Sequence, residues 1–266
     1  MPILLLVIIL GIVEGLTEYL PVSSTGHLIL ATELLGFKAD QWALFNIAIQ
    51  PGAILAIVVL YWRTFRDVLV GLWQREHSAF AFTRNLLIAF VPAVVLGLAL
   101  GDQIELLLGN AVVVAWALII GGIAILVVEK LAKPRESGGV ARLEIRQSLV
   151  IGLVQCLAMV PGVSRSGATI LGAMAMGVDR KTAAEFSFFL AVPTLSGATV
   201  LQLAKHHAEI APGMVGHILL GALVSFVVAV VVVKGFVAII QRFGFAPFAW
   251  YRIIAGIAAL VWLGAR

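Results

Sequence analysis

Charged residues are scarce in this sequence. Asp, Glu, Lys and Arg together make up 12% of its 266 residues, which is about half the share found in soluble globular domains. Hydrophobic residues reach 62%, and the mean hydropathy is +1.10. These values exclude an ordinary soluble domain. They predict an all-α, polytopic membrane protein that forms one membrane domain over residues 1–266.

Cysteine is nearly absent as well. Cys156 is the one cysteine, so the sequence has neither a disulfide framework nor a cysteine-based metal site. Cys156 lies among apolar residues, and we expect it to be a small buried packing residue. The apolar start of the chain lacks the basic residues that open a signal peptide, and we expect the mature protein to retain it.

Six segments are long and apolar enough to cross about 30 Å of hydrocarbon, which takes roughly 20 helical residues. They are 42–61, 85–101, 110–128, 184–203, 214–233 and 247–264. Two further apolar regions, 1–35 and 147–178, are interrupted by LPVSSTG and VPGVSRSG. Each half of these regions is too short to span, so the two regions are predicted to be re-entrant helix hairpins.

The basic residues indicate the orientation. Loops 63–84 and 130–146 are basic, whereas the loop near 102–105 carries neither Lys nor Arg. In a membrane protein, Lys and Arg report orientation, and the basic loops lie on the cytoplasmic side. The first hairpin is therefore expected to enter from outside and the second from the cytoplasm.

The chain also resembles itself at a shift of 141 residues. The matched pairs include Gly11 with Gly152, Ser23 with Ser164, and Gly26 with Gly167. The Ser-x-x-Gly run of one interruption therefore coincides with that of the other. Together with the opposite orientations, this predicts an inverted-topology repeat, about 1–129 and 142–266, whose interrupted helices meet near the midplane and form a binding site.

The first interruption follows two carboxylates. Glu14 and Glu18 are four residues apart and share one face of a helix. Neighbouring carboxylates repel each other and need a cation, a shared proton or a positive partner. A hard divalent ion, Mg²⁺ or Ca²⁺, prefers such oxygen ligands. The alternative is a pair of interfacial carboxylates in contact with water.

Hydroxyl residues precede the second half of each hairpin. Ser and Thr before an apolar run are typical of helix starts, where free N–H groups and the helix dipole bind phosphate. The second interruption adds Arg165, whose planar guanidinium suits phosphate oxygens. The predicted phosphate-binding residues are Ser23, Thr25, Gly26, Ser164, Ser166, Gly167 and Thr169. Taken singly, each hydroxyl is explained equally well by helix capping.

The motifs EGLTEYLPVSSTGH and PGVSRSGAT, with the length and spacing of the whole chain, resemble those of the bacitracin-resistance family of undecaprenyl-diphosphate phosphatases. The resemblance implies a multi-pass enzyme of the bacterial inner membrane that hydrolyses undecaprenyl diphosphate to undecaprenyl phosphate and inorganic phosphate. This reaction recycles the lipid carrier for peptidoglycan and other wall polymers and confers bacitracin resistance. The resemblance also implies a divalent cation and an active site that opens to the periplasm.

Carried over by motif, the resemblance places catalysis at Glu14, Glu18, Ser24, His27 and Arg165. We expect both glutamates to hold the metal, or one of them to act as a base. Ser24 lies one helical turn before His27, so the imidazole could take its proton. Ser24 would then attack the phosphorus. The alternatives are that His27 attacks it directly or that His27 activates a water molecule.

A transporter or flippase for a phosphorylated lipid is the second functional class, because interrupted helices in inverted repeats are the usual design of secondary transporters. The expected partners are undecaprenyl diphosphate and membrane lipids, not nucleic acid, and a homodimer is an assembly that the sequence leaves open. Asn46 and Gln50, four apart on the next span, are candidates for lining the cavity or for hydrogen bonds across helices.

Overall fold

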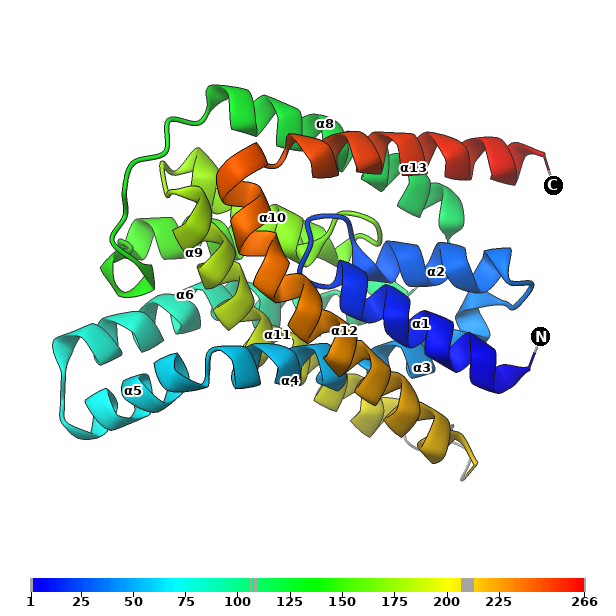
Figure 1. The fold of residues 1–266 in the computed structure, drawn as a ribbon, viewed down its shortest axis with the longest axis horizontal. Helices are drawn as coiled ribbons and strands as arrows, with labels where there is room; N and C mark the ends of the chain where they lie inside the picture. The colour runs from blue at the N-terminus through cyan, green and yellow to red at the C-terminus, as the bar shows by residue number, and fades with distance from the viewer. Residues whose placement is uncertain (1, 106, 108–109, 207–212, 266) are drawn as a thin grey trace.

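The computed structural model describes residues 2–105, 107, 110–206 and 213–265, and its regular structure is helical (Figure 1). The α-helices are α1 (Ile3–Thr17), α2 (Ser24–Leu34), α3 (Ala39–Ala48), α4 (Gln50–Leu60), α5 (Trp62–Trp73), α6 (His77–Ala99), α7 (Gly101–Glu105), α8 (Ala111–Leu131), α9 (Ile145–Gln155), α10 (Arg165–Ala175), α11 (Arg180–His206), α12 (Met214–Phe243) and α13 (Ala246–Gly264). Two short 3₁₀ helices, η1 (Val140–Arg142) and η2 (Cys156–Met159), complete them.

The predicted membrane spans are confirmed as helices. Among the described residues, six helical segments are long and apolar enough to cross a membrane, and they correspond to the six predicted ones. Several extend beyond the prediction, as α12 does by continuing to Phe243. The extensions are polar or mixed in character, so a criterion based on apolar length stops short of them. The fold is that of a multi-pass membrane protein.

Two details of the helices differ from expectation. The first span is two helices, α3 and α4, which meet at Ile49, because Pro51 in the first turn of α4 lacks an N–H group and crowds the preceding turn. We expected a loop over 63–84, but Trp62–Trp73 is a helix. Its apolar residues recur at helical spacing and its polar residues occupy the other face, which favours an amphipathic helix.

The interruptions between α1 and α2 and between α9 and α10 are built alike. Ser23 precedes α2 with a φ of 73° and accepts the Gly26 N–H at 3.3 Å. Ser164 precedes α10 with a φ of 78° and accepts the Gly167 N–H at 3.0 Å. Positive φ is uncommon outside glycine, so its occurrence at both serines agrees with the 141-residue repeat. The re-entrant course in the membrane and the inverted orientation stay predictions.

Glycines allow the interrupted helices to approach the long ones closely. A Cβ atom at Gly11 of α1 would lie 2.7 Å from the Gly221 carbonyl oxygen of α12. A Cβ atom at Gly152 of α9 would lie 2.6 Å from the Ala89 carbonyl oxygen of α6. Small residues at crossings are how helices pack closely in membranes. α8 lies along α13 at one edge (Figure 1), and the interruptions come together beneath this pair.

Cys156 differs slightly from its predicted role. It is half-buried rather than buried, and its thiol donates to the Gly152 carbonyl one turn earlier. It takes no part in the site described next.

Candidate active site

A cavity of about 500 Å³ lies where the two interruptions meet. Its polar end is lined by Glu18, Ser23, Ser24, Thr25, Ser164 and Arg165. Its apolar part is lined by residues of α6 and α11, including Phe90, Val94, Gly97, Leu195, Ala198 and Leu201. Further polar side chains also line it, namely Gln50, Gln155, Thr194 and Gln202. A cavity that combines charged groups with a largely apolar wall suits an amphiphile with an anionic head group and a hydrocarbon chain.

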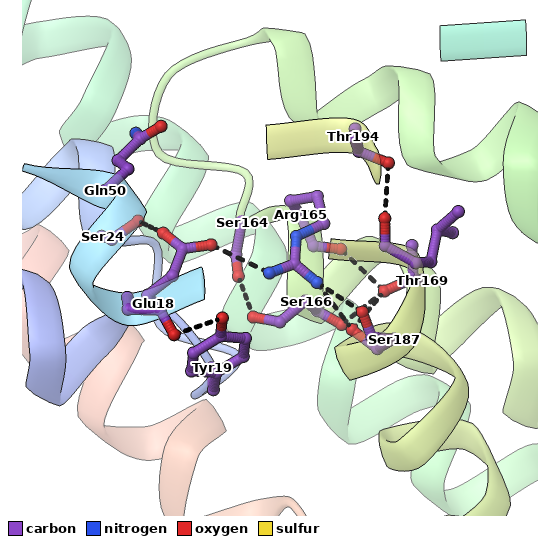
Figure 2. A network of polar contacts seen from close by, with 12 residues as sticks. Glu18, Tyr19, Ser24, Gln50, Ser164, Arg165, Ser166, Thr169, Ser187 and Thr194 are labelled. Carbon is purple, nitrogen blue, oxygen red and sulfur yellow. Dashed lines mark hydrogen bonds and ion pairs between the residues drawn. The ribbon is translucent and has the colours of Figure 1, made fainter. Parts of the chain in front are cut away.

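The centre of the polar end is a buried ion pair. Arg165 Nη2 lies 2.9 Å from Glu18 Oε1, and the side chains are 9% and 4% exposed. Arg165 Nη1 also donates to the carbonyl oxygen of Ser187 at 2.7 Å and to its hydroxyl at 3.1 Å. Figure 2 shows the guanidinium held between Glu18 on one side and Ser187 on the other. The pair therefore joins the first interruption to the second, and both to α11.

Glu18 has a second partner in the same place. The Ser24 hydroxyl donates to Glu18 Oε2, while Arg165 occupies Oε1 (Figure 2). Ser24 is the first residue of α2, where the backbone N–H groups of the first turn point out of the helix. A carboxylate that accepts a hydrogen bond from a hydroxyl can remove its proton during attack. A hydroxyl and a guanidinium therefore contact the same carboxylate, an arrangement that is compatible with nucleophilic attack assisted by a general base.

His27 takes a different position from the predicted one. Its Nδ1 lies 2.8 Å from the Ser23 carbonyl oxygen, and its Nε2 lies 2.7 Å from the Tyr251 hydroxyl. The imidazole stacks on the Tyr251 ring with centroids 5.5 Å apart. The expected Ser24–His27 hydrogen bond is thus not formed, because the serine turns back across the interruption to Glu18 and the imidazole turns toward α13.

Glu14 is fully buried, and neither of its carboxylate oxygens has a hydrogen-bond partner within the described residues. The carboxylate is repelled by Glu18 and attracted by Arg165 through electrostatic interactions. A buried carboxylate without partners requires a compensating proton or cation. No cluster of three or more His, Cys, Asp or Glu occurs in the described parts of the chain, so two glutamates are what the protein offers a cation here. Mg²⁺ typically uses one or two carboxylates together with substrate phosphates. The two glutamates match that number, but Glu14 does not line the cavity and both oxygens of Glu18 already accept hydrogen bonds.

The predicted phosphate-binding residues fall into two groups. Ser23, Thr25 and Ser164 line the cavity. The other four support the loops: Gly26 and Gly167 donate to the capping serines, Ser166 donates to the Leu20 carbonyl at 2.7 Å, and Thr169 donates to the Ser187 hydroxyl at 2.8 Å. For these four the geometry gives capping and loop support, and phosphate binding stays a prediction.

Some cavity residues had only weak signals in the sequence, or none. Gln50 lines the main cavity, whereas Asn46 lines a smaller cavity of about 90 Å³ that shares Gln50 and Thr25. Gln155, which matches Glu14 in the repeat, also lines the main cavity. Ser187 lies within an apolar stretch of α11, and nothing in its neighbourhood indicates that it would orient Arg165.

Comparison with known proteins gives consistent matches. A family model described as bacitracin resistance protein BacA matches residues 7–258. The undecaprenyl-diphosphatase of Novosphingobium aromaticivorans is 61% identical over 263 residues, covering 97% of each chain. The undecaprenyl-diphosphatase of Sphingopyxis alaskensis is 56% identical over 257 residues, again covering 97% of each chain. That of Rhizorhabdus wittichii is 54% identical over 264 residues, covering 99% of this chain and 98% of the relative.

The buried ion pair predicts a specific pattern of stability. Arg165→Met leaves the Glu18 carboxylate without its cation and is expected to lower the free energy of unfolding by about 3 kcal/mol. The double variant Glu18→Gln/Arg165→Met removes both charges and should recover most of that loss. Denaturation of the purified variants in detergent measures both effects.

The control is Arg66→Met, which breaks an ion pair with Asp67 whose side chains are 58% and 64% exposed. It should unfold like the wild type, because exposed pairs contribute little. A double variant as unstable as Arg165→Met alone would contradict the ion pair as the cause.

Proposed function

The chain belongs to the bacitracin-resistance BacA family, and from this premise we propose that it hydrolyses undecaprenyl diphosphate to undecaprenyl phosphate and inorganic phosphate. The observation that carries the proposal is the contact of Ser24 and Arg165 with one carboxylate, Glu18, at the charged end of an apolar cavity. The reaction recycles the lipid carrier for peptidoglycan and other wall polymers, and it accounts for the resistance to bacitracin after which the family is named.

The cavity sets how the substrate lies. The diphosphate occupies the polar end beside Arg165, and the isoprenoid chain runs between α6 and α11 along residues such as Phe90 and Leu201. Because the isoprenoid chain already lies in hydrocarbon before it binds, its contacts with these residues orient the substrate by packing and do not gain free energy by transfer from water.

Ser24 is the nucleophile in the mechanism that we propose. Its hydroxyl oxygen attacks the terminal phosphorus while its proton passes to Glu18, and undecaprenyl phosphate leaves. Glu18 gives the proton to the departing undecaprenyl phosphate and is again a carboxylate. Water then attacks the phosphoserine, Glu18 accepts a proton from this water and returns it to the Ser24 oxygen as the Ser24–phosphorus bond breaks, and inorganic phosphate is released. Arg165 and the N–H groups at the start of α2 stabilise the charge on the phosphoryl oxygens, the dominant contribution in such reactions.

A divalent cation, Mg²⁺ or Ca²⁺, is part of the proposal. Glu14 and Glu18 would hold it, and the two unpartnered oxygens of Glu14 support this choice. When bound, such an ion neutralises charge on phosphate oxygens. Glu14 contributes the free oxygens, whereas the oxygens of Glu18 already bond to Ser24 and Arg165.

We further propose that the protein lies in the bacterial inner membrane with the site open to the periplasm, on the basis of the loop charges. Undecaprenyl diphosphate and membrane lipids are its partners. The oligomeric state that we propose is a homodimer.

Phosphate release tests the proposed function against the alternative of a transporter or flippase. Purified wild-type protein in detergent, where no compartments exist, should release inorganic phosphate from undecaprenyl diphosphate. Glu18→Gln should lower kcat by about 10²–10⁴-fold, because the general base is lost, and Ser24→Ala should abolish turnover. Thr64→Ala on α5 is the matched control and should retain full activity. A transporter without hydrolytic activity would release no phosphate even as wild type.

Removal of divalent cations tests the metal assignment. Treatment with EDTA should abolish phosphate release, and added Mg²⁺ should restore it and raise the thermal unfolding temperature, because a ligand of the folded state stabilises it. Glu14→Gln should lose this thermal shift, whereas Glu76→Gln on the exposed α5–α6 turn should keep it. Full activity and an unchanged unfolding temperature after chelation would rule out the cation.

Cysteine labelling tests the orientation. In a Cys156→Ser background, a membrane-impermeant maleimide applied to intact spheroplasts should label Gln103→Cys on α7. It should reach Glu136→Cys, in the basic loop, only after lysis. The reverse pattern would place the site on the cytoplasmic side.

A further inference from the structure

Arg252 of α13 is buried more deeply than its charge would suggest. It is 1% exposed and is the largest of the fully buried side chains. Its guanidinium donates five hydrogen bonds, and every acceptor is a main-chain carbonyl. The acceptors are Leu118 (3.3 Å), Ala117 (3.0 Å), Pro21 (2.9 Å), Val163 (3.0 Å) and Gly162 (2.9 Å). No carboxylate is among its hydrogen-bond partners in the part of the chain that the structure describes.

These carbonyls belong to both interruptions. Pro21 lies in the first, Gly162 and Val163 lie in the second, and the other two acceptors are on α8. An interrupted helix leaves carbonyl groups without helical partners, which is costly at membrane depth. One side chain from a third helix supplies the missing donors to both loops. Figure 1 shows α13 lying along α8 above the loops that precede α2 and α10.

Arg252 bonds to the two loops at matching positions. Pro21 and Gly162 coincide under the 141-residue shift, and one guanidinium nitrogen bonds to each: Nη1 to Pro21 and Nη2 to Gly162. Three residues further along each loop come Ser24 and Arg165, which also coincide under the same shift. The guanidinium therefore sets the distance between the two points from which the nucleophile and the phosphate-binding cation extend.

The surrounding helices make room for this side chain. A Cβ atom at Gly121 of α8 would collide with the guanidinium, and one at Gly167 would lie 3.4 Å from Nη1. Arg252 does not line the cavity, unlike Arg165. Its guanidinium bonds to the loops from outside the cavity, so we expect any effect on turnover to pass through the loops.

We propose that Arg252 is a positioning residue for the phosphatase reaction, which ties the two interruptions together so that Ser24 and Arg165 act on one phosphoryl group. The inference rests on the proposed function for its effect on turnover, but the tie between the loops is independent of it. A guanidinium suits this task, because its planar fork can bond several carbonyls at once, whereas an ammonium is a compact charge with three donors.

Two variants separate positioning from general stability. Arg252→Met removes all donors and should lower kcat for undecaprenyl diphosphate by about 100-fold with little change in KM, because a small misplacement of the nucleophile has an effect of that size. Arg252→Lys keeps the charge and some of the donors and should recover part of the lost kcat.

Asn85→Leu is the control. Asn85 is also fully buried and donates to two main-chain carbonyls, those of Val140 and Leu143, but it is not among the residues that line the cavity. It should lower thermal stability and keep the wild-type kcat.

Hydrogen–deuterium exchange measures the tie directly, without substrate. In Arg252→Met, amide exchange should rise in both segments 18–26 and 159–167, while Asn85→Leu should leave both unchanged. Unchanged exchange in either segment, or a wild-type kcat in Arg252→Met, would overturn the proposal. A kcat lowered equally by Asn85→Leu would do so as well. Failure of the wild-type protein to release phosphate would instead count against the proposed function, and the exchange result would still decide the tie.

Discussion

Everything at this site depends on one constraint: a helix that is interrupted in the protein interior must find partners for its free N–H and C=O groups. The chain meets that constraint with its own side chains. Ser23 and Ser164 accept the N–H groups that start α2 and α10, and Arg252 donates to the carbonyls on the other side of each interruption. The loops are thereby held in the non-helical course that places polar groups around a cavity, and the same contacts that make the interruptions tolerable shape the site.

The buried ion pair between Glu18 and Arg165 contributes both to the stability of the fold and to the proposed chemistry. Glu18 is placed where Arg165 neutralises it and Ser24 bonds to it, so one carboxylate links the two halves of the chain and contacts Ser24, the nucleophile that we propose. The pair is enclosed by protein and cavity rather than by bulk water, where its interactions would be weaker. Glu14 is buried near this pair, and its carboxylate has no hydrogen-bond partner among the residues that the structure describes. Two carboxylates therefore face one guanidinium, which leaves one negative charge without a counter-charge or a proton.

Much of this follows from the sequence, for identifiable reasons. The spans are predictable because apolar length is dictated by the thickness of the bilayer. Both interruptions contain Pro, Gly and Ser, and a serine and a glycine in each coincide at a shift of 141 residues. The partners of Arg252 and Ser187 were not predictable, because they lie far away in the chain and depend on how the helices assemble. His27 shows a related limit: helical spacing brings it near Ser24, but spacing does not determine which way a side chain turns.

The measurement that tests the central claim most directly is the location of a trapped phosphoryl group. Rapid quench of the purified protein with undecaprenyl diphosphate labelled in its terminal phosphate, in a denaturant at neutral to mildly alkaline pH that preserves both phosphoserine and acid-labile phosphohistidine, followed by peptide mass spectrometry without acid, reports the residue that attacks phosphorus. Because Glu18 contacts Ser24 and the imidazole of His27 faces Tyr251, the adduct should lie on Ser24. A phosphohistidine at residue 27 would contradict this account.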